Sequence, residues 1–161
     1  MRTSTLPAPT EPAVWRALLR AQATIARRLQ ADLLAAHDLA LGSYDVLLHL
    51  SEAPGGRLRM NDLADRVLLS RSGLTRLIDR LQAAGLVARQ SCDSDARGLY
   101  AVLTPAGRAR LAEATPTYRR AVRRYMLDRL DPQELRTLEE ILTRLTGEED
   151  RAVPLQTPRE T

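Results

Sequence analysis

Residues 70–84 carry side chains that bond well to polar partners, and they are placed at helical spacing. Apolar residues recur there at intervals of three and four and define one face of a helix: Leu74, Leu77, Ile78 and Leu81. The opposite face carries guanidinium and hydroxyl groups with one acid: Arg71, Ser72, Thr75, Arg76 and Asp79. Guanidinium groups pair with guanine edges or phosphate, and small hydroxyl groups bond to either without steric bulk. The segment therefore has the chemistry for reading nucleic acid, with an ordinary solvated helix face as the alternative.

The charge distribution points to the same part of the chain. All 24 side chains counted as lysine or arginine are arginine, against 20 acidic ones. Residues 57–110 carry 10 arginines against 5 acids, whereas residues 1–56 carry 5 of each and residues 111–161 carry 9 against 10. The positive surplus lies in the middle third, which is the distribution expected of a phosphate-binding module.

The elements around this segment form a helix-turn-helix pattern followed by a hairpin. In chain order the sequence predicts a helix over 61–67, a tight connection at 68–69, a helix over 70–84, and strands over 86–90 and 99–104 around a polar loop, 91–98. Asn61 and Ser70 are the candidate N-caps of the two helices. Gly85 is the candidate residue that ends the second helix.

Longer amphipathic helices are predicted on both sides of this module, over 10–36, 43–53, 105–130 and 132–147. Ser43 is the candidate cap of the second, and Asp131 with Glu134 can form a capping box on the last. The apolar stripes of the first and last helices need partners that the small central module cannot supply. We therefore expect an obligate homodimer.

Short stretches between residues 63 and 107 resemble the MarR family of winged helix-turn-helix transcription regulators. They are, in order, Leu63–Ala64, Ser70, Thr75–Leu81, Gly85–Val87, Arg89, Asp95–Gly98 and Val102–Gly107. The flanking helices fall where that family places its dimerisation helices, so the resemblance extends over about residues 12–147. One departure is Ala96, which stands between Asp95 and Arg97 where many relatives carry a second arginine.

The resemblance implies a mainly α fold with a small β-hairpin wing and long N- and C-terminal dimerisation helices. It divides the chain into a flexible N-terminus (1–11), a helical region contributing to dimerisation (12–56), a winged helix-turn-helix DNA-binding module (57–104), dimerisation helices (105–147) and a disordered tail (148–161). The recognition helix would enter the major groove and the wing the adjacent minor groove of a pseudo-palindromic double-stranded operator. The implied DNA-binding residues are Ser70, Arg71, Ser72, Thr75, Arg76, Arg89 and Arg97. Asp79 would pair with an arginine of the wing or the recognition helix.

The resemblance also implies a repressor that a small aromatic or phenolic effector releases from DNA. Polar-tipped residues that could reach an effector cleft are Trp15, Tyr44, His49 and Tyr118, and amphipathic packing is their alternative role. A winged-helix module that binds protein instead of DNA is the rival function, and a small hydrolase or transferase is a more distant one.

Catalytic and metal-binding motifs are missing from the sequence. Asp93–Gly98 imitates the start of a calcium loop, but Arg97 occupies a ligand position and Thr104 stands where a glutamate is needed. His37, His49 and Cys92 lack metal-ligand spacing, and a single cysteine forms no internal disulfide. No run of about 18 apolar residues and no signal peptide is apparent. We expect a cytoplasmic, non-enzymatic protein without metal, cofactor or membrane partner.

Overall fold

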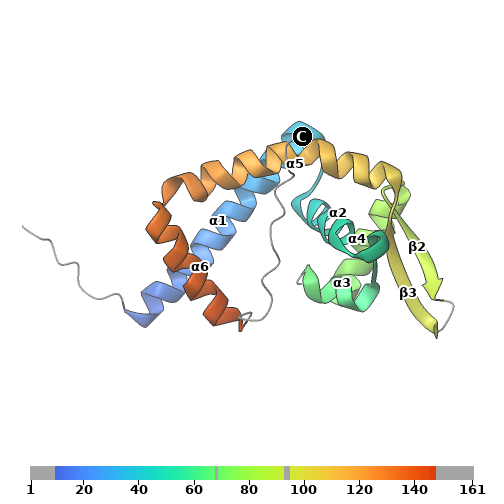
Figure 1. Ribbon diagram of the computed structural model, residues 1–161, viewed down its shortest axis with the longest axis horizontal. Helices are drawn as coiled ribbons and strands as arrows, with labels where there is room; N and C mark the ends of the chain where they lie inside the picture. The colour runs from blue at the N-terminus through green and yellow to red at the C-terminus, as the bar shows by residue number, and fades with distance from the viewer. Residues whose placement is uncertain (1–9, 68, 93–94, 148–161) are drawn as a thin grey trace, which may run out of the picture. The chain divides into compact units, whose positions relative to one another are not determined.

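The computed structural model describes residues 10–67, 69–92 and 95–147 (Figure 1). Two compact units divide inside helix α5 (Pro105–Tyr125), the first ending at Val122 and the second beginning at Arg123. The expected flexible N-terminus falls largely outside the described residues, and the expected disordered tail falls wholly outside them.

Two helices open the first unit, α1 (Glu11–His37) and α2 (Leu41–Glu52). The first of these confirms the long helix that apolar periodicity predicts over residues 10–36. The expectation that Ser43 caps the second helix is wrong, because the N-cap residue is Ala40. The Gln30 side chain of α1 instead accepts a hydrogen bond from the Leu41 backbone N–H at 2.7 Å. The first backbone N–H of α2 is thus bonded to a side chain of α1, so it does not need a serine cap.

A short strand that the sequence patterns did not predict precedes the first helix of the central module. After a 3₁₀ turn, Pro54–Gly56, strand β1 covers Arg57–Arg59, and α3 follows as Met60–Arg66. The expected cap at Asn61 is therefore wrong, since the extended residue before the helix is Arg59 and Asn61 lies in the first turn.

Helix α4 (Arg71–Ala83) begins and ends as the sequence predicts. The Ser70 hydroxyl accepts a hydrogen bond from the Gly73 N–H at 3.1 Å, which caps the helix. Gly85 has a φ of +72°, a left-handed conformation that favours glycine just past a helix end. Leu68, in the predicted tight connection, lies outside the described residues.

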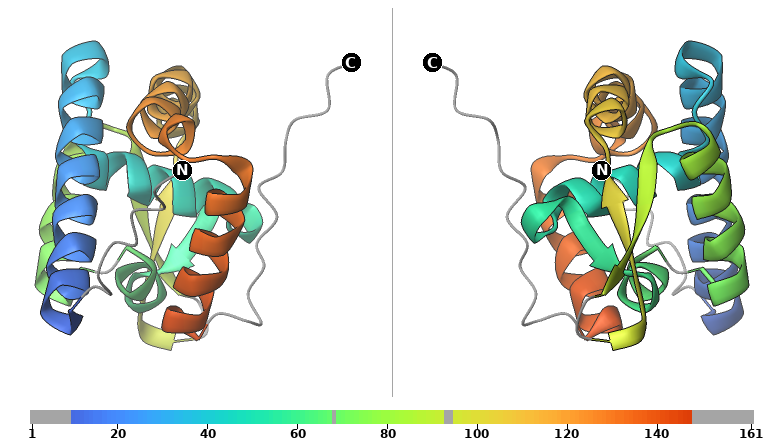
Figure 2. Two further views of the ribbon diagram at one scale, coloured as in Figure 1. Left: turned by 90° about the vertical axis from the view of Figure 1, so that its left-hand side faces the viewer. Right: turned by 90° about the vertical axis from the view of Figure 1, so that its right-hand side faces the viewer.

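The sheet has three antiparallel strands in the order β1-β3-β2. The wing hairpin consists of β2 (Val87–Cys92) and β3 (Asp95–Leu103), which run side by side in Figures 1 and 2. The predicted loop over 91–98 is therefore too long, because residues 91–92 and 95–98 belong to the strands. Cross-strand pairing extends both strands into polar residues, where the alternation of apolar and polar side chains gives no sign of a strand.

Helix α5 starts directly against the base of the wing. The Thr104 hydroxyl donates to the Gly85 carbonyl at 2.7 Å and accepts from the Gly107 N–H at 3.0 Å. A Cβ atom on Gly107 would stand 2.0 Å from the Leu86 carbonyl oxygen, so only glycine permits this approach. The helix ends at Tyr125, earlier than the predicted Leu130, and a 3₁₀ turn, Leu127–Arg129, follows.

The second unit contains α6 (Pro132–Thr146), which begins with the predicted capping box. The Asp131 carboxylate accepts from the Gln133 and Glu134 N–H groups, and the Glu134 carboxylate accepts from the Asp131 N–H. None of the side chains of this helix is fully buried.

The core of the first unit is built by α1 to α5 and the sheet. Its largest fully buried side chains are Tyr44, Leu33, Leu47, Leu50, Leu63, Leu74, Ile78, Val46 and Val87. Helix α4 contributes its whole apolar face, Leu74, Leu77, Ile78 and Leu81. That burial fixes the rotation of the helix and keeps its polar face on the surface.

Candidate nucleic-acid interface

The outer face of α4 presents guanidinium and hydroxyl groups to solvent. Arg71, Ser72, Thr75 and Arg76 are all exposed, together with the cap Ser70. The Ser70 and Ser72 hydroxyl oxygens lie 3.3 Å apart, and the Thr75 hydroxyl donates to the Arg71 carbonyl at 2.8 Å. Among the described residues neither Arg71 nor Arg76 forms an ion pair. Both guanidinium groups therefore keep their donors open for an anionic partner.

Arg89, on strand β2, lies against α4 instead of projecting freely from the wing. Its guanidinium donates to the Gln82 side chain at 2.9 Å and to the Thr75 carbonyl at 3.4 Å. It also lies 2.6 Å from the Asp79 carboxylate. The expectation that Asp79 pairs with an arginine of the wing is thus confirmed. Arg89, predicted to contact DNA, bonds strand β2 to helix α4.

Arg97 lies on strand β3, with Asp95 and Ala96 before it. The side chains of residues 92–98 fall outside those that the structure describes, and the DNA contact expected of Arg97 lies among them.

Two of the four predicted effector residues come together. The Tyr44 and Tyr118 rings stack with centroids 4.4 Å apart and 22° between their planes. The Tyr44 hydroxyl lies 3.3 Å from the Thr115 hydroxyl. Burial raises the pKa of both phenols above the usual value of 10.0. Tyr44 is fully buried, so in this arrangement it serves the core of the first unit.

The other two predicted effector residues do not join this stack. Trp15 is 61% exposed on α1 and makes no ring contact with another described residue. His49 lies one helical turn after Asp45 on α2. Burial raises the pKa of the Asp45 carboxyl, and the charge of His49 lowers that pKa in part.

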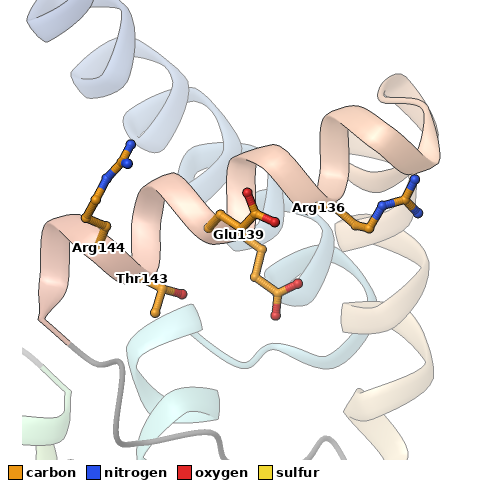
Figure 3. A pocket seen from close by; sticks show the side chains of 5 residues that line it. Arg136, Glu139, Thr143 and Arg144 are labelled. Atoms are coloured by element: carbon orange, nitrogen blue, oxygen red, sulfur yellow. The ribbon is translucent and has the colours of Figure 1, made fainter.

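A pocket of about 570 Å³ lies along α6 and is lined by Arg136, Glu139, Glu140, Thr143 and Arg144 (Figure 3). All five belong to one helix, so the pocket is an open hollow on its surface. None of the predicted effector residues lines it. Within residues 10–67, 69–92 and 95–147, no group of three or more acidic, histidine or cysteine side chains is arranged to hold a metal.

Solved structures with the same fold are found among transcription regulators. AbsC, a MarR family transcriptional regulator from Streptomyces coelicolor, is 34% identical, with a TM-score of 0.80 over 89% of this chain and 97% of that one. The chain belongs to the MarR family. The family's profile matches residues 37–98.

A second MarR family regulator from Streptomyces coelicolor, Sco3205, was solved in complex with DNA. It is 31% identical, with a TM-score of 0.81 over 93% of this chain and 95% of that one. The HTH-type transcriptional repressor YetL of Bacillus subtilis is 33% identical over 82 residues, which are 51% of this chain and 49% of that protein. The match thus spans about half the length of YetL.

Membership of the MarR family confirms the winged helix-turn-helix fold expected from the sequence. As a MarR protein, the chain is a DNA-binding transcription regulator and not an enzyme. In the described part of the chain, no helix has the length and apolar character needed to cross a membrane.

Proposed function

We propose that this MarR regulator binds a pseudo-palindromic operator as a homodimer and represses transcription from it. Helix α4 enters the major groove, and the β2–β3 wing reaches the adjacent minor groove. The observation that carries the proposal is the exposed face of α4, where Arg71 and Arg76 stand without an ion-pair partner among the described residues.

Base and phosphate contacts are assigned to two groups of residues. Ser70, Arg71, Ser72, Thr75 and Arg76 meet the major groove, and Arg97 meets the minor groove. A cation in a narrow minor groove gains from the enhanced negative potential there. Arg89 supports these contacts by holding β2 on α4.

Exposed apolar side chains support the homodimer. On α1 these include Val14, Trp15, Leu18 and Leu19, between 41% and 61% exposed, and on α6 they are Ile141 and Leu145, 39% and 67% exposed. Apolar side chains gathered on one helix are covered when a second copy packs against them. A dimer also supplies the two recognition helices that a pseudo-palindrome requires.

The repressor assignment draws on the relative YetL, which is named a transcriptional repressor. Release from DNA is assigned to a small aromatic or phenolic effector bound beside the half-buried Tyr118 and His49, near the Tyr44 stack.

Selection of bound fragments from random double-stranded DNA tests the function directly. The expected outcome is one enriched motif with two inverted half-sites whose centres lie about one helical turn apart. Light scattering of the same protein should give twice the 17.9 kDa chain mass. Failure to enrich any motif, or a folded monomer at micromolar concentration, would contradict the proposal.

Arg97→Ala tests the minor-groove assignment in that operator. The affinity should fall by roughly 1–3 kcal/mol, and the salt dependence of log affinity should weaken by up to about one unit. A lower melting temperature with an unchanged salt dependence would instead mean that Arg97 serves the fold.

A further inference from the structure

A carboxylate without a bonding partner lies where α2 meets α5 in the first unit. Asp45 follows Tyr44 on α2, and the stacked rings of Tyr44 and Tyr118, 4.4 Å apart, bring α5 against that helix. Burial raises the pKa of both phenols and the charge of Asp45 raises each further, so the carboxylate lies near both rings. Asp45 is half-buried, and among the described residues its carboxylate accepts no hydrogen bond and forms no ion pair.

Two more polar side chains beside this carboxylate have open polar atoms. His49 lies one helical turn after Asp45, and Tyr118 faces α2 from α5; both are half-buried and form no side-chain hydrogen bond within the described part of the chain. Every fully buried side-chain nitrogen or oxygen atom in that part has a hydrogen-bond partner. The unbonded groups of these three residues are therefore reached by solvent and open to a ligand. We call Asp45, His49 and Tyr118 the carboxylate site.

The permanent charges around the stacked rings are negative on balance. Burial raises the pKa of the Tyr44 phenol, and the Thr115 hydrogen bond lowers it in part. Among the charges, Arg119 lowers this pKa, whereas Asp45 and Glu52 raise it. Glu52 and Arg119 are exposed, so solvent screens them more than it screens the half-buried Asp45. A half-buried carboxylate without a partner carries a desolvation cost that a bound cation would offset.

The groups of the carboxylate site match an organic cation. An ionised carboxylate only accepts hydrogen bonds, and a neutral imidazole and a phenol can each accept one. An ammonium group supplies the donors, and its bond to a carboxylate is charge-assisted. The face of a tyrosine ring also attracts a cation. An aromatic carboxylate would instead meet the like charge of Asp45 at close range.

We propose that the carboxylate site binds a small organic ammonium ion with an aromatic group, and that this ion is the effector that releases the regulator from DNA. The inference rests on the proposed release by a small aromatic effector and assigns the charge of that effector. Asp45 pairs with the ammonium group, the Tyr118 ring contacts it, and neutral His49 accepts a further hydrogen bond. Because α5 follows β3 after one residue, a ligand between α2 and α5 acts on the helix that begins at the wing.

Calorimetric titration of the full chain at pH 7 compares probes of similar size. Phenethylamine and benzyltrimethylammonium are the cations, phenethyl alcohol is the neutral control and phenylpropionate is the anion. Phenethylamine should bind about tenfold more tightly than phenethyl alcohol, because a hydrogen bond to a charged group is stronger than one between neutral groups. Phenylpropionate should bind most weakly. If neither cation binds more tightly than the alcohol, the proposal is wrong.

Asp45→Asn keeps the size of the side chain and removes its charge. It should lower the affinity for phenethylamine about tenfold and leave that for phenethyl alcohol unchanged. Asp65→Asn makes the same change at an exposed position on α3 and should alter neither affinity. Unchanged phenethylamine binding in Asp45→Asn, or an equal loss in Asp65→Asn, would overturn the role of Asp45.

Variants of Tyr118 test the contact with the ring. Tyr118→Phe keeps the aromatic face and should bind benzyltrimethylammonium like the wild type, whereas Tyr118→Leu should bind it several-fold more weakly. Thermal melts of each variant establish that the first unit is folded. Equal affinities in Tyr118→Leu and the wild type would overturn the ring contact.

A metal ion is the other cation that Asp45 and His49 could take. If zinc chloride binds the wild type but not Asp45→Asn, and neither organic cation binds, the site takes a metal ion and the proposal is wrong.

The effect on DNA is measured with the selected operator. Phenethylamine should weaken operator binding by the wild type and should have less effect on Asp45→Asn. Binding of both cations without any change in operator affinity would overturn the effector assignment. Failure to select an operator would contradict the proposed function itself, and the titrations of the free protein do not depend on that result.

Discussion

The Arg89 guanidinium lies 2.6 Å from the Asp79 carboxylate and thereby ties the wing strand β2 to the recognition helix α4. Asp79 is the one acid on the outward face of this helix, where it would repel phosphate. Arg89 cancels that charge and at the same time fixes how the wing lies against the helix. The same ion pair thus neutralises the acid on the outward face of α4 and holds β2 against that helix.

A double-mutant cycle separates the two roles of this pair. Arg89→Ala should weaken operator binding, because it leaves the Asp79 carboxylate unpaired beside DNA. Adding Asp79→Asn should restore part of the affinity by removing the repulsion. Because the pair is partly exposed, each variant should change the free energy of unfolding by no more than about 1 kcal/mol. If the double variant binds as weakly as Arg89→Ala, Arg89 contacts DNA directly.

Arg76→Ala tests the assignment of α4 to the major groove. The expected loss of operator affinity is about 1–3 kcal/mol, with relaxed base preference at one position of each half-site. The melting temperature should stay unchanged, because Arg76 is exposed and the apolar face of α4 is untouched. Arg136→Ala on α6 removes the same charge elsewhere and should bind like the wild type. Equal binding by both variants would refute the assignment.

Two glycine-to-alanine changes should move stability in opposite directions. Gly107→Ala forces a Cβ atom to within 2.0 Å of the Leu86 carbonyl oxygen and should destabilise the fold by about 1–3 kcal/mol or more. Gly42→Ala adds a Cβ at an ordinary 3.8 Å from Leu77 inside α2 and should stabilise by about 0.4–1 kcal/mol. Denaturant melts measure both. A neutral Gly107→Ala would show that α5 does not need this close approach.

Asp45 should make stability depend on pH in acid. Burial raises the pKa of its carboxyl above the ordinary value of 3.8, and the charge of His49 lowers it in part. The folded state then binds more protons than the unfolded state between the two pKa values, so this contribution to stability is full below 3.8 and is lost as pH rises through the raised pKa. The groups facing Asp45 are His49 on its own helix and the phenols of Tyr44 and Tyr118.

Asp45→Asn should therefore melt at a higher temperature than the wild type at pH 7, and the difference should shrink towards pH 4. His49→Gln removes the charge that partly offsets the effect of burial on Asp45. In the wild-type background this change should lower the melting temperature at pH 6, and in the Asp45→Asn background it should not. A constant difference between Asp45→Asn and the wild type from pH 4 to pH 7 would contradict the raised pKa.

Several signals that lie within a few residues of each other predict the structure correctly, although the caps expected at Ser43 and Asn61 are wrong. Ser70 caps α4 through the N–H three residues on, and Asp131 with Glu134 closes a capping box over the same span. The apolar spacing from Leu74 to Leu81 likewise predicted which face of α4 is buried. In each case the partners are neighbours in the chain, so local chemistry is sufficient.

Features that depend on distant partners were missed. Strand β1 has one apolar residue, Leu58, and exists because it pairs with β3 more than 40 residues later. Helix α2 starts before Ser43 because Gln30 of another helix satisfies its first N–H. The stacking of Arg57 and Arg59 on the Tyr100 ring also needs cross-strand contacts that no spacing rule reports.

The junction between β3 and α5 contains one residue, Thr104, whose hydroxyl accepts from the Gly107 N–H of α5 and donates to the Gly85 carbonyl just after α4. No loop separates β3 from α5, so a rotation of α5 about its axis must also turn the base of the wing. An inserted residue at this point would shift the following helix by about 100° and break its packing register. Length variation should therefore be selected against at Thr104.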